Sequence, residues 1–467
     1  MIGPSSRKTV SLLLLALISA YAIAQELGAS ASLARWVLVA QIAWVALEFR
    51  NLAGISKLTF AVIASMSLVF YFHGGISEEL LWKAIERSAF FTLFLLSLDT
   101  LRTAANSSRL VQKTGHLIVN QPPGRRYAML SLGGHLFAVL LNVGSINLLG
   151  TMVARSVRKP KQGYDAVVQA IRLKRMTLAL VRAFAAFTMW APSSVTVFAV
   201  ITAIPDFDWV EFAPMGASIA AVVLCFGWLL DRLTYPKSKL SNLQETQGDL
   251  LRSFTSLVLL ISTLLATTLL FGSVADTGLI GSLLICIPFF STIWMMVQFK
   301  RKGPKRAALL GIRRVVRQVI PGFLSLRSEV VILSSAGFIA VVLPHQIDTE
   351  ALGQMIASQN LSEAWLLVMM MWIVFLTAPI GLNPMISTLV CLEILIQLPN
   401  FTFTPYALSM GAVVAWGLAT GMSPFGATIR LSGRTVSHAP SRIGLAWNGP
   451  FSIIVLVAAS AVQLILN

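Results

Sequence analysis

The chain has 467 residues, of which 56% are hydrophobic and only 12% are charged. Soluble domains average roughly 45–50% apolar and about 25% charged residues, so this composition excludes a soluble enzyme of two or three ordinary domains. The formal net charge is +17. Because cytoplasmic loops of membrane proteins collect Lys and Arg, we interpret this charge as a topology signal and expect no nucleic-acid partner. The sequence therefore predicts an all-α, polytopic helical membrane protein whose partner is the lipid bilayer.

Cysteine and histidine residues show no spacing typical of a metal site or a disulfide framework. The three cysteines, Cys225, Cys286 and Cys391, each lie inside an apolar run, and the five histidines are scattered along the chain. No GxxxxGK[ST], GxSxG or HExxH motif occurs, so nucleotide-binding and hydrolase signatures are missing. We expect no enzyme activity, no metal site and no bound cofactor.

At roughly 20 residues per crossing, about thirteen apolar segments are long enough to enter or cross the membrane. The first follows Arg7 and Lys8, an arrangement shared by cleaved signal peptides and uncleaved membrane helices. We favour the uncleaved helix because many spans follow. The segments are 10–24, 35–49, 58–72, 88–103, 128–153, 176–204, 212–231, 253–272, 278–298, 328–344, 364–398, 404–421 and 449–466.

Loop charge predicts the side of the membrane on which each loop lies. Basic residues gather in 155–175 and 300–317, whereas 202–211, 273–277 and 345–363 contain acids but neither Lys nor Arg. The two basic loops are therefore expected in the cytoplasm and the other three on the opposite side. We expect a multi-pass protein of the cell membrane, in a bacterium the inner membrane.

The segment 128–153 begins after Arg126 and ends before Arg155, so both of its ends are expected in the cytoplasm. A single helix would place them on opposite sides. We therefore predict a re-entrant hairpin, whose non-helical tip must be buried in protein or line a water-filled cavity. The tip contains Asn142, Gly144, Ser145 and Asn147.

Proline interrupts two further apolar segments, at Pro192 and at Pro384. Proline removes a backbone donor and clashes with the preceding turn, so each segment is expected to be a broken helix or a hairpin. The two breaks match at an offset of about 192 residues, and neighbouring segments match in the same order. This internal repeat is either parallel or inverted. It predicts N-terminal membrane helices over 1–54, a first repeat over 55–245, and a second repeat with a C-terminal helix over 246–467.

Paired broken segments in corresponding positions are typical of a transporter binding site. With the hairpin, they give a plan that resembles the ion transporter superfamily of secondary carriers, which includes divalent anion/sodium symporters, arsenite and citrate carriers and the membrane subunit of TRAP transporters. The resemblance covers roughly 55–467 and implies that hairpin and break loops bind the substrate and sodium. The Ser-Asn-Thr triplets typical of the dicarboxylate branch are absent, so neither a dicarboxylate substrate nor sodium coupling follows from it.

The site residues implied by the resemblance are small and polar. Their hydroxyls and amides either bind a solute without a fixed charge or cap the backbone groups that a break frees. Besides the hairpin tip, they are Ser193, Ser194, Thr196, Asn383, Ser387, Thr388, Ser423 and Thr428.

Three ionisable residues inside apolar segments have two interpretations each. Glu393 is either a proton-coupling carboxyl or a side chain that reaches the interface. Arg182 either faces an aqueous cavity and attracts an anion or extends to the cytoplasmic interface. His135 either titrates near neutral pH or is a hydrogen-bonded packing residue.

The leading hypothesis is a secondary active transporter of a small, anionic solute, coupled to a sodium or proton gradient. Na⁺ would then be a coupling ion, and a second copy of the chain, in a homodimer, is a candidate partner. The alternatives are a membrane-embedded enzyme that acts on a lipid or polyprenyl substrate, and a channel. The sequence names neither the solute nor the ion.

Overall fold

The computed structural model describes residues 4–29, 34–158, 165–205, 207–235 and 247–466. Within these ranges all regular structure is helical. Nine of the described helices are long and apolar enough to cross a membrane. The expectation of an all-α, multi-pass membrane protein is thereby confirmed.

Several of the expected apolar segments are too short or too interrupted to cross on their own. The helix α2 (Ala34–Glu48) has only 15 residues. The segment 128–153 is divided between α6 (Pro123–Leu141) and α7 (Gly144–Arg158), and 176–204 between α8 (Ala166–Thr188) and α9 (Val195–Ala203). The chain therefore turns inside segments that their apolar sequence alone predicts to be continuous.

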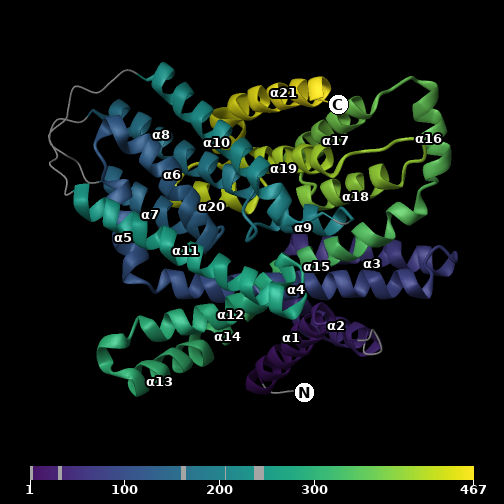
Figure 1. Ribbon diagram of the computed structural model, residues 1–467, viewed down its shortest axis with the longest axis horizontal. Coiled ribbons are helices and arrows are strands. Elements are labelled where there is room, and N and C mark those ends of the chain that lie inside the picture. Colours follow the sequence, from purple (N-terminus) through teal and green to yellow (C-terminus); the bar gives the residue numbers. More distant parts are fainter. Residues whose placement is uncertain (1–3, 30–33, 159–164, 206, 236–246, 467) are drawn as a thin grey trace. The chain divides into compact units, whose positions relative to one another are not determined.

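The chain forms two compact units, each built from two separate stretches of sequence. Unit 1 contains residues 1–107 and 264–352, and unit 2 contains 108–263 and 353–467. Both expected repeats thus contribute to each unit. Besides α2, the main helices of unit 1 are α1 (Pro4–Glu26), α3 (Gly54–Phe72), α4 (Glu78–Asn106), α12 (Leu279–Val297), α13 (Pro304–Arg314) and α15 (Arg327–Val342) (Figure 1).

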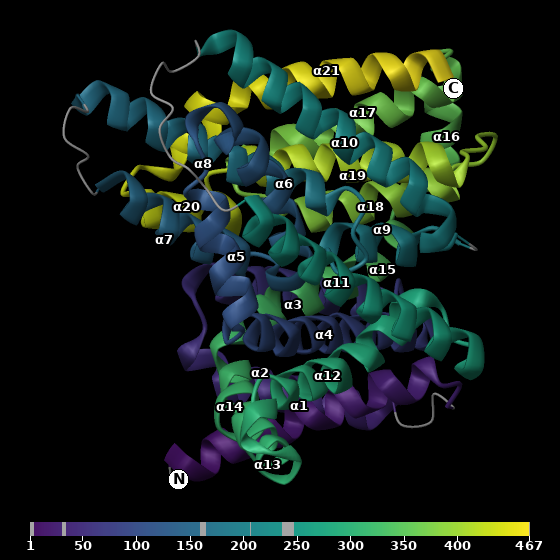
Figure 2. The ribbon, with the colours of Figure 1, turned by 60° about the vertical axis from the view of Figure 1, so that its left-hand side comes forward.

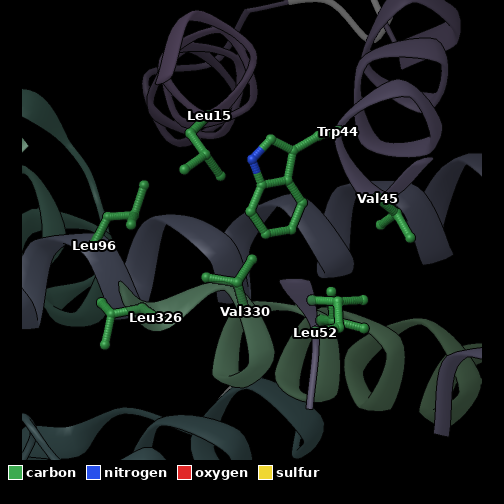
Figure 3. Packing of buried hydrophobic residues seen from close by; sticks show 8 residues of the cluster. Leu15, Trp44, Val45, Leu52, Leu96, Leu326 and Val330 are labelled. Carbon is green, nitrogen blue, oxygen red and sulfur yellow. The ribbon is translucent and has the colours of Figure 1, made fainter. Parts of the chain in front are cut away.

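The core of unit 1 gathers around α4, which packs against α1, α12 and α15. Figure 3 shows one of its clusters, where Leu15, Trp44 and Leu96 meet Val330. Fully burying one such side chain contributes roughly 1.5–3 kcal/mol. At the rim, the buried carboxylate of Glu48 pairs with Arg327 at 3.1 Å.

Unit 2 contains all the site residues expected from the sequence. Its remaining helices are α5 (Arg109–Val119), α10 (Trp209–Thr234), the first part of α11 (Gln247–Ala275), the last part of α16 (Thr349–Ser358), α17 (Glu363–Thr377), α18 (Pro384–Gln397), α19 (Pro405–Met422), α20 (Ala427–Val436) and α21 (Gly449–Leu466). In Figure 2, α10, α17 and α21 lie alongside α19, in agreement with their contacts.

The helices of unit 2 pack in two matching sets. In one, α8 packs against α6, α7 and α10; in the other, α19 packs against α17, α18 and α21. The sets interlock, because α9 packs against α18, α20 packs against α7, and α8 packs against α19. Glycine permits close packing between α19 and the end of α8, since a Cβ at Gly417 of α19 would lie 2.9 Å from the Met189 side chain.

Candidate functional site

The first helical hairpin turns at Asn142 and Val143, between α6 and α7. Asn142 has a φ of 49° and a ψ of −133°, a positive-φ conformation, outside the left-handed helical region, that glycine adopts most readily. Its Oδ1 accepts a hydrogen bond from the Val143 amide at 2.8 Å, and its Nδ2 donates to the Ser193 carbonyl at 3.2 Å. Gly144, Ser145 and Asn147, expected in the tip, lie in the first turn of α7.

The first helix break separates α8 from α9, around Pro192. Ser194 caps α9: its hydroxyl accepts from the Val197 amide at 3.1 Å and donates to the Thr188 carbonyl at 3.3 Å. The neighbouring Ser193 hydroxyl donates to the Val139 carbonyl at 3.0 Å. The break is therefore tied to the hairpin at two points, Val139 at the end of α6 and Asn142 in the tip.

The second helical hairpin joins α17 to α18, which pack against each other. A single 3₁₀ turn, Ala378–Ile380, leads to Gly381, whose φ of 104° is readily adopted only by glycine. Asn383 caps α18 by accepting from the Met385 amide at 3.0 Å. Pro384 occupies the first helical position, where a missing N–H costs nothing.

The second helix break lies between α19 and α20. The Ser423 hydroxyl donates to the Ala378 carbonyl at 2.7 Å and accepts from the Phe425 amide at 3.3 Å. Asn448 donates to the Gly421 carbonyl at 2.9 Å, which satisfies one of the carbonyls that the end of α19 leaves free.

The two hairpins and the two breaks share one geometric feature. In each pair, a serine of the break donates to the carbonyl three residues before the positive-φ residue of the hairpin tip. Ser193 thus bonds to Val139, three before Asn142. Ser423 bonds to Ala378, three before Gly381.

Three threonine hydroxyls near these tips and breaks lack hydrogen-bond partners within the described residues. Thr196 and Thr428 are each the second residue of the helix that follows a break, and each is 1% exposed. The hydroxyl of Thr388 on α18 is fully buried and unpartnered. A buried unsatisfied hydroxyl such as that of Thr388 costs about 1–3 kcal/mol, and all three hydroxyls are candidates for binding a ligand.

The other polar site residues differ in exposure and in partners. The Ser145 hydroxyl donates to the Asn142 carbonyl at 2.7 Å, and Ser387 donates to the Pro384 carbonyl at 3.2 Å. Asn147 is exposed on α7, and Glu393 is half-buried further along α18. The structure brings Asn142 and Ser193 into direct contact.

Arg182 is buried between several helices of unit 2. Its Nε donates to Asn448 Oδ1 at 3.0 Å, and its Nη1 donates to the Tyr127 hydroxyl at 3.0 Å. The guanidinium carbon lies 4.1 Å from the centre of the Phe451 ring. Nη1 also donates to the Gly227 carbonyl at 3.4 Å. All three groups that Arg182 bonds are neutral, so an amide, a phenol, a backbone carbonyl and an aromatic ring hold the cation.

Asp231, one turn beyond a carbonyl that Arg182 contacts, is paired with a different arginine. It accepts two hydrogen bonds from Arg175, at 2.9 and 2.7 Å. This bidentate geometry is typical of strong arginine–carboxylate pairs. The neighbouring carboxylate is therefore already engaged by Arg175, and its pairing does not involve Arg182.

His135 has both ring nitrogens engaged. Nε2 accepts from the Trp190 indole at 2.7 Å, so Nδ1 carries the proton that it shares with the Ala183 carbonyl at 3.3 Å. The Trp190 carbonyl in turn accepts from the Trp209 indole at 2.8 Å. This arrangement is that of a hydrogen-bonded packing residue.

Sequence reasoning missed the residues that support the second break. Asn448 lies in a π-helical turn, Arg442–Asn448, and links Arg182 to the end of α19. In the same turn, a Cβ at Gly444 would lie 2.1 Å from the Met422 carbonyl. The one feature of the sequence that could have indicated Asn448 is that this polar side chain directly precedes Gly449 and Pro450 at the start of an apolar run.

Comparison with known proteins gives a distant structural likeness. No protein-family model matches the chain, and no curated protein matches it. Among solved structures, the fold is similar to that of the YdaH transporter of Alcanivorax borkumensis, whose crystal structure is described as revealing an unusual topology. The match has 14% sequence identity and a TM-score of 0.44, and it covers 79% of this chain and 84% of that chain.

Proposed function

We propose that the protein is a secondary active transporter of a small anionic solute, coupled to a sodium or proton gradient, and a member of the ion transporter superfamily. The observation that carries this proposal is the pairing of two hairpin tips with two helix breaks by equivalent serine hydrogen bonds. Broken helices in corresponding positions are the usual site of a secondary transporter.

The proposed solute charge follows from the direction of the short helices. Four of them begin at a tip or a break: α7 at Gly144, α9 at Val195, α18 at Pro384 and α20 at Ala427. A helix N-terminus carries free N–H groups and a partial positive charge, which favour anions. The unpartnered hydroxyls of Thr196 and Thr428 would donate to the same solute or accept from it.

We further propose that unit 2 consists of two repeats, in which α6 to α10 correspond to α17 to α21. The matching packing sets and the matching serine bonds support this correspondence. This correspondence of helices replaces the alignment of Pro192 with Pro384 at an offset of about 192 residues. Pro192 lies in a helix break, whereas Pro384 begins the second arm of a hairpin.

Loop charge supports inversion of the repeats and re-entrant hairpins. Arg125 and Arg126 begin α6, whereas the segment before α17, 345–363, contains acids but neither Lys nor Arg. By the positive-inside rule, the two hairpins would enter from opposite sides of the membrane. Each tip would then be buried against the break of its own repeat, as polar backbone at membrane depth requires.

Transport by reconstituted protein tests the proposal. Thr196→Val and Thr428→Val remove a hydroxyl with little change in shape, and each should lower uptake into liposomes at least about 10-fold, since one hydrogen bond to a charged solute is worth about 1.5–3 kcal/mol. Thr255→Val is the matched control, because Thr255 is exposed on α11 and bonds only within its helix. Unchanged uptake in both site variants would refute the site.

Ion gradients test the coupling separately. Uptake should require an imposed sodium or proton gradient, and uptake that continues unchanged with all gradients collapsed would contradict secondary active transport. Electrical currents far above carrier turnover would instead identify a channel.

A further inference from the structure

A pocket of about 280 Å³ lies at the end of α20, in the turn that leads to the π-helical segment. Arg430, Arg434 and His438 line it, together with Gly433, Ser437 and Pro440. Thr428 and Arg430 are two residues apart on α20, so their side chains point about 200° apart around the helix. In agreement, Thr428 is buried and Arg430 is exposed. The pocket therefore faces away from the proposed solute site.

The pocket is positively charged without compensation. Arg430 and Arg434 are one helical turn apart, and neither has an ion pair within the described part of the chain. The whole stretch 423–449 contains no Asp or Glu. His438 shares its Nδ1 proton with the Val436 carbonyl at 2.9 Å, so its Nε2 remains available to the pocket. Two unpaired guanidinium groups in one concave site favour an anion with several oxygens.

Beside this pocket, the Trp447 ring lies near two further basic side chains, those of Lys174 and Arg442. This ring lies 5.0 Å from the His438 ring, centre to centre. Lys174 Nζ and the Arg442 guanidinium carbon each lie 5.9 Å from the indole centre. Tryptophan with nearby Lys and Arg is typical of the membrane–water interface, where the ring contacts lipid and the cations contact headgroups.

The position of the pocket along the chain also indicates an interface. It lies between two candidate membrane spans, Pro405–Val436 and Arg442–Leu466, and Ser437, His438 and Pro440 belong to the connection. A short connection between two spans must lie where the chain leaves and re-enters the bilayer. Basic pockets at that depth bind lipid phosphates.

We propose that Arg430, Arg434 and His438 bind the phosphate group of an anionic phospholipid headgroup. The two guanidinium groups would donate to the phosphate oxygens in the forked geometry typical of arginine, and Trp447 would pack against the glycerol or the first methylenes of the acyl chains. Inorganic phosphate offers the same oxygens without an acyl chain, so the two sources can be separated experimentally.

Lipid binding to the purified full-length protein tests this proposal. The melting temperature in detergent is measured with added phosphatidylglycerol, phosphatidylcholine or sodium phosphate, and retained lipid is counted by native mass spectrometry. We expect phosphatidylglycerol alone to raise the melting temperature. Arg430→Gln with Arg434→Gln should weaken its binding about 10-fold or more. Arg232→Gln with Arg252→Gln removes the same charge from exposed positions and should leave binding within about 2-fold.

Three outcomes would overturn the proposal. Equal weakening by both double variants would mean that only net charge attracts the lipid. Undiminished binding by the Arg430 and Arg434 variant would exclude the pocket. If sodium phosphate raised the melting temperature as much as phosphatidylglycerol does, and this rise were lost in the Arg430 and Arg434 variant, the pocket would be assigned to a soluble anion. If the glutamine variant does not fold, Arg430→Lys with Arg434→Lys retains the charge but loses the fork, and should still weaken binding several-fold.

Discussion

Replacing Arg182 with methionine tests whether this buried cation holds the second helix break in place. Arg182 is 4% exposed, and Asn448, which it bonds at 3.0 Å, is 1% exposed and itself donates to the Gly421 carbonyl at the end of α19. The substitution would leave the Asn448 oxygen and the Tyr127 hydroxyl without their donor.

The expected loss of stability follows from these two groups. Each buried polar atom left unpaired costs about 1–3 kcal/mol, so the two together cost about 2–6 kcal/mol. A methionine sulfur near the Phe451 ring would recover roughly 0.3–1.5 kcal/mol. We expect Arg182→Met to melt several degrees below the wild type in detergent and to lose transport.

Two further variants separate the contributions of charge, geometry and position. Arg182→Lys keeps the charge, but one ammonium group cannot reproduce the guanidinium fork, so it should melt close to Arg182→Met. Arg232→Met on α10 is the control, because Arg232 is exposed and surface substitutions usually change stability by less than about 0.5 kcal/mol. If Arg182→Met melts like the Arg232 control, the buried network contributes nothing, and the reasoning is refuted.

Three more substitutions address separate parts of the fold. Gly444→Ala would place a Cβ 2.1 Å from the last carbonyl of α19 and should abolish uptake into liposomes. Gly124→Ala is the control and should transport normally, because a Cβ there has no neighbouring atom within 4 Å. Equal uptake by the two variants would contradict the close packing at Gly444. Asn142→Val should lower transport more than Asn142→Gly, since a β-branched residue at positive φ is strained by about 1–2 kcal/mol; the reverse order in liposome uptake would argue against this conformation. Glu48→Leu should lower the melting temperature by removing the carboxylate that pairs with the partly exposed Arg327, at a cost of about 1–3 kcal/mol. Adding Arg327→Leu should restore most of the loss, and additive losses in the double variant would exclude that coupling.

The sequence predicted where the chain turns better than which residues meet. The basic residues on both sides of 128–153 indicated a turn within an apolar segment, and the structure places one at Asn142. Pro192 correctly marked an interruption, because proline is poorly tolerated inside a helix. Proline at Pro384 was ambiguous, since the same residue is favoured at the first position of a helix, and there the turn itself is made by Gly381.

Long-range partners were beyond the reach of sequence patterns. Asn448 is 266 residues from Arg182, and the serine of each break bonds to a plain backbone carbonyl, which any residue type supplies. Periodicity and loop charge describe local conformation and sidedness, but they do not encode such contacts. The same limit applied to Arg182, whose polar partners come from α6, α10 and the π-helical turn.

The interlocked packing of unit 2 has a consequence for synthesis of the protein in the cell. The helices α7 and α9 leave the ribosome with residues 108–263, but α20 and α18, which cover them, belong to residues 353–467. About 90 residues of unit 1 are made in between. Because α9 ends at Ala203 and α18 spans Pro384–Gln397, at a rate of 5–20 residues per second α9 would wait roughly 10–40 s in the membrane before its partner exists. During that interval, the buried serines and threonines of the first break must be shielded by the translocation machinery, by a chaperone or by the surrounding lipid headgroups.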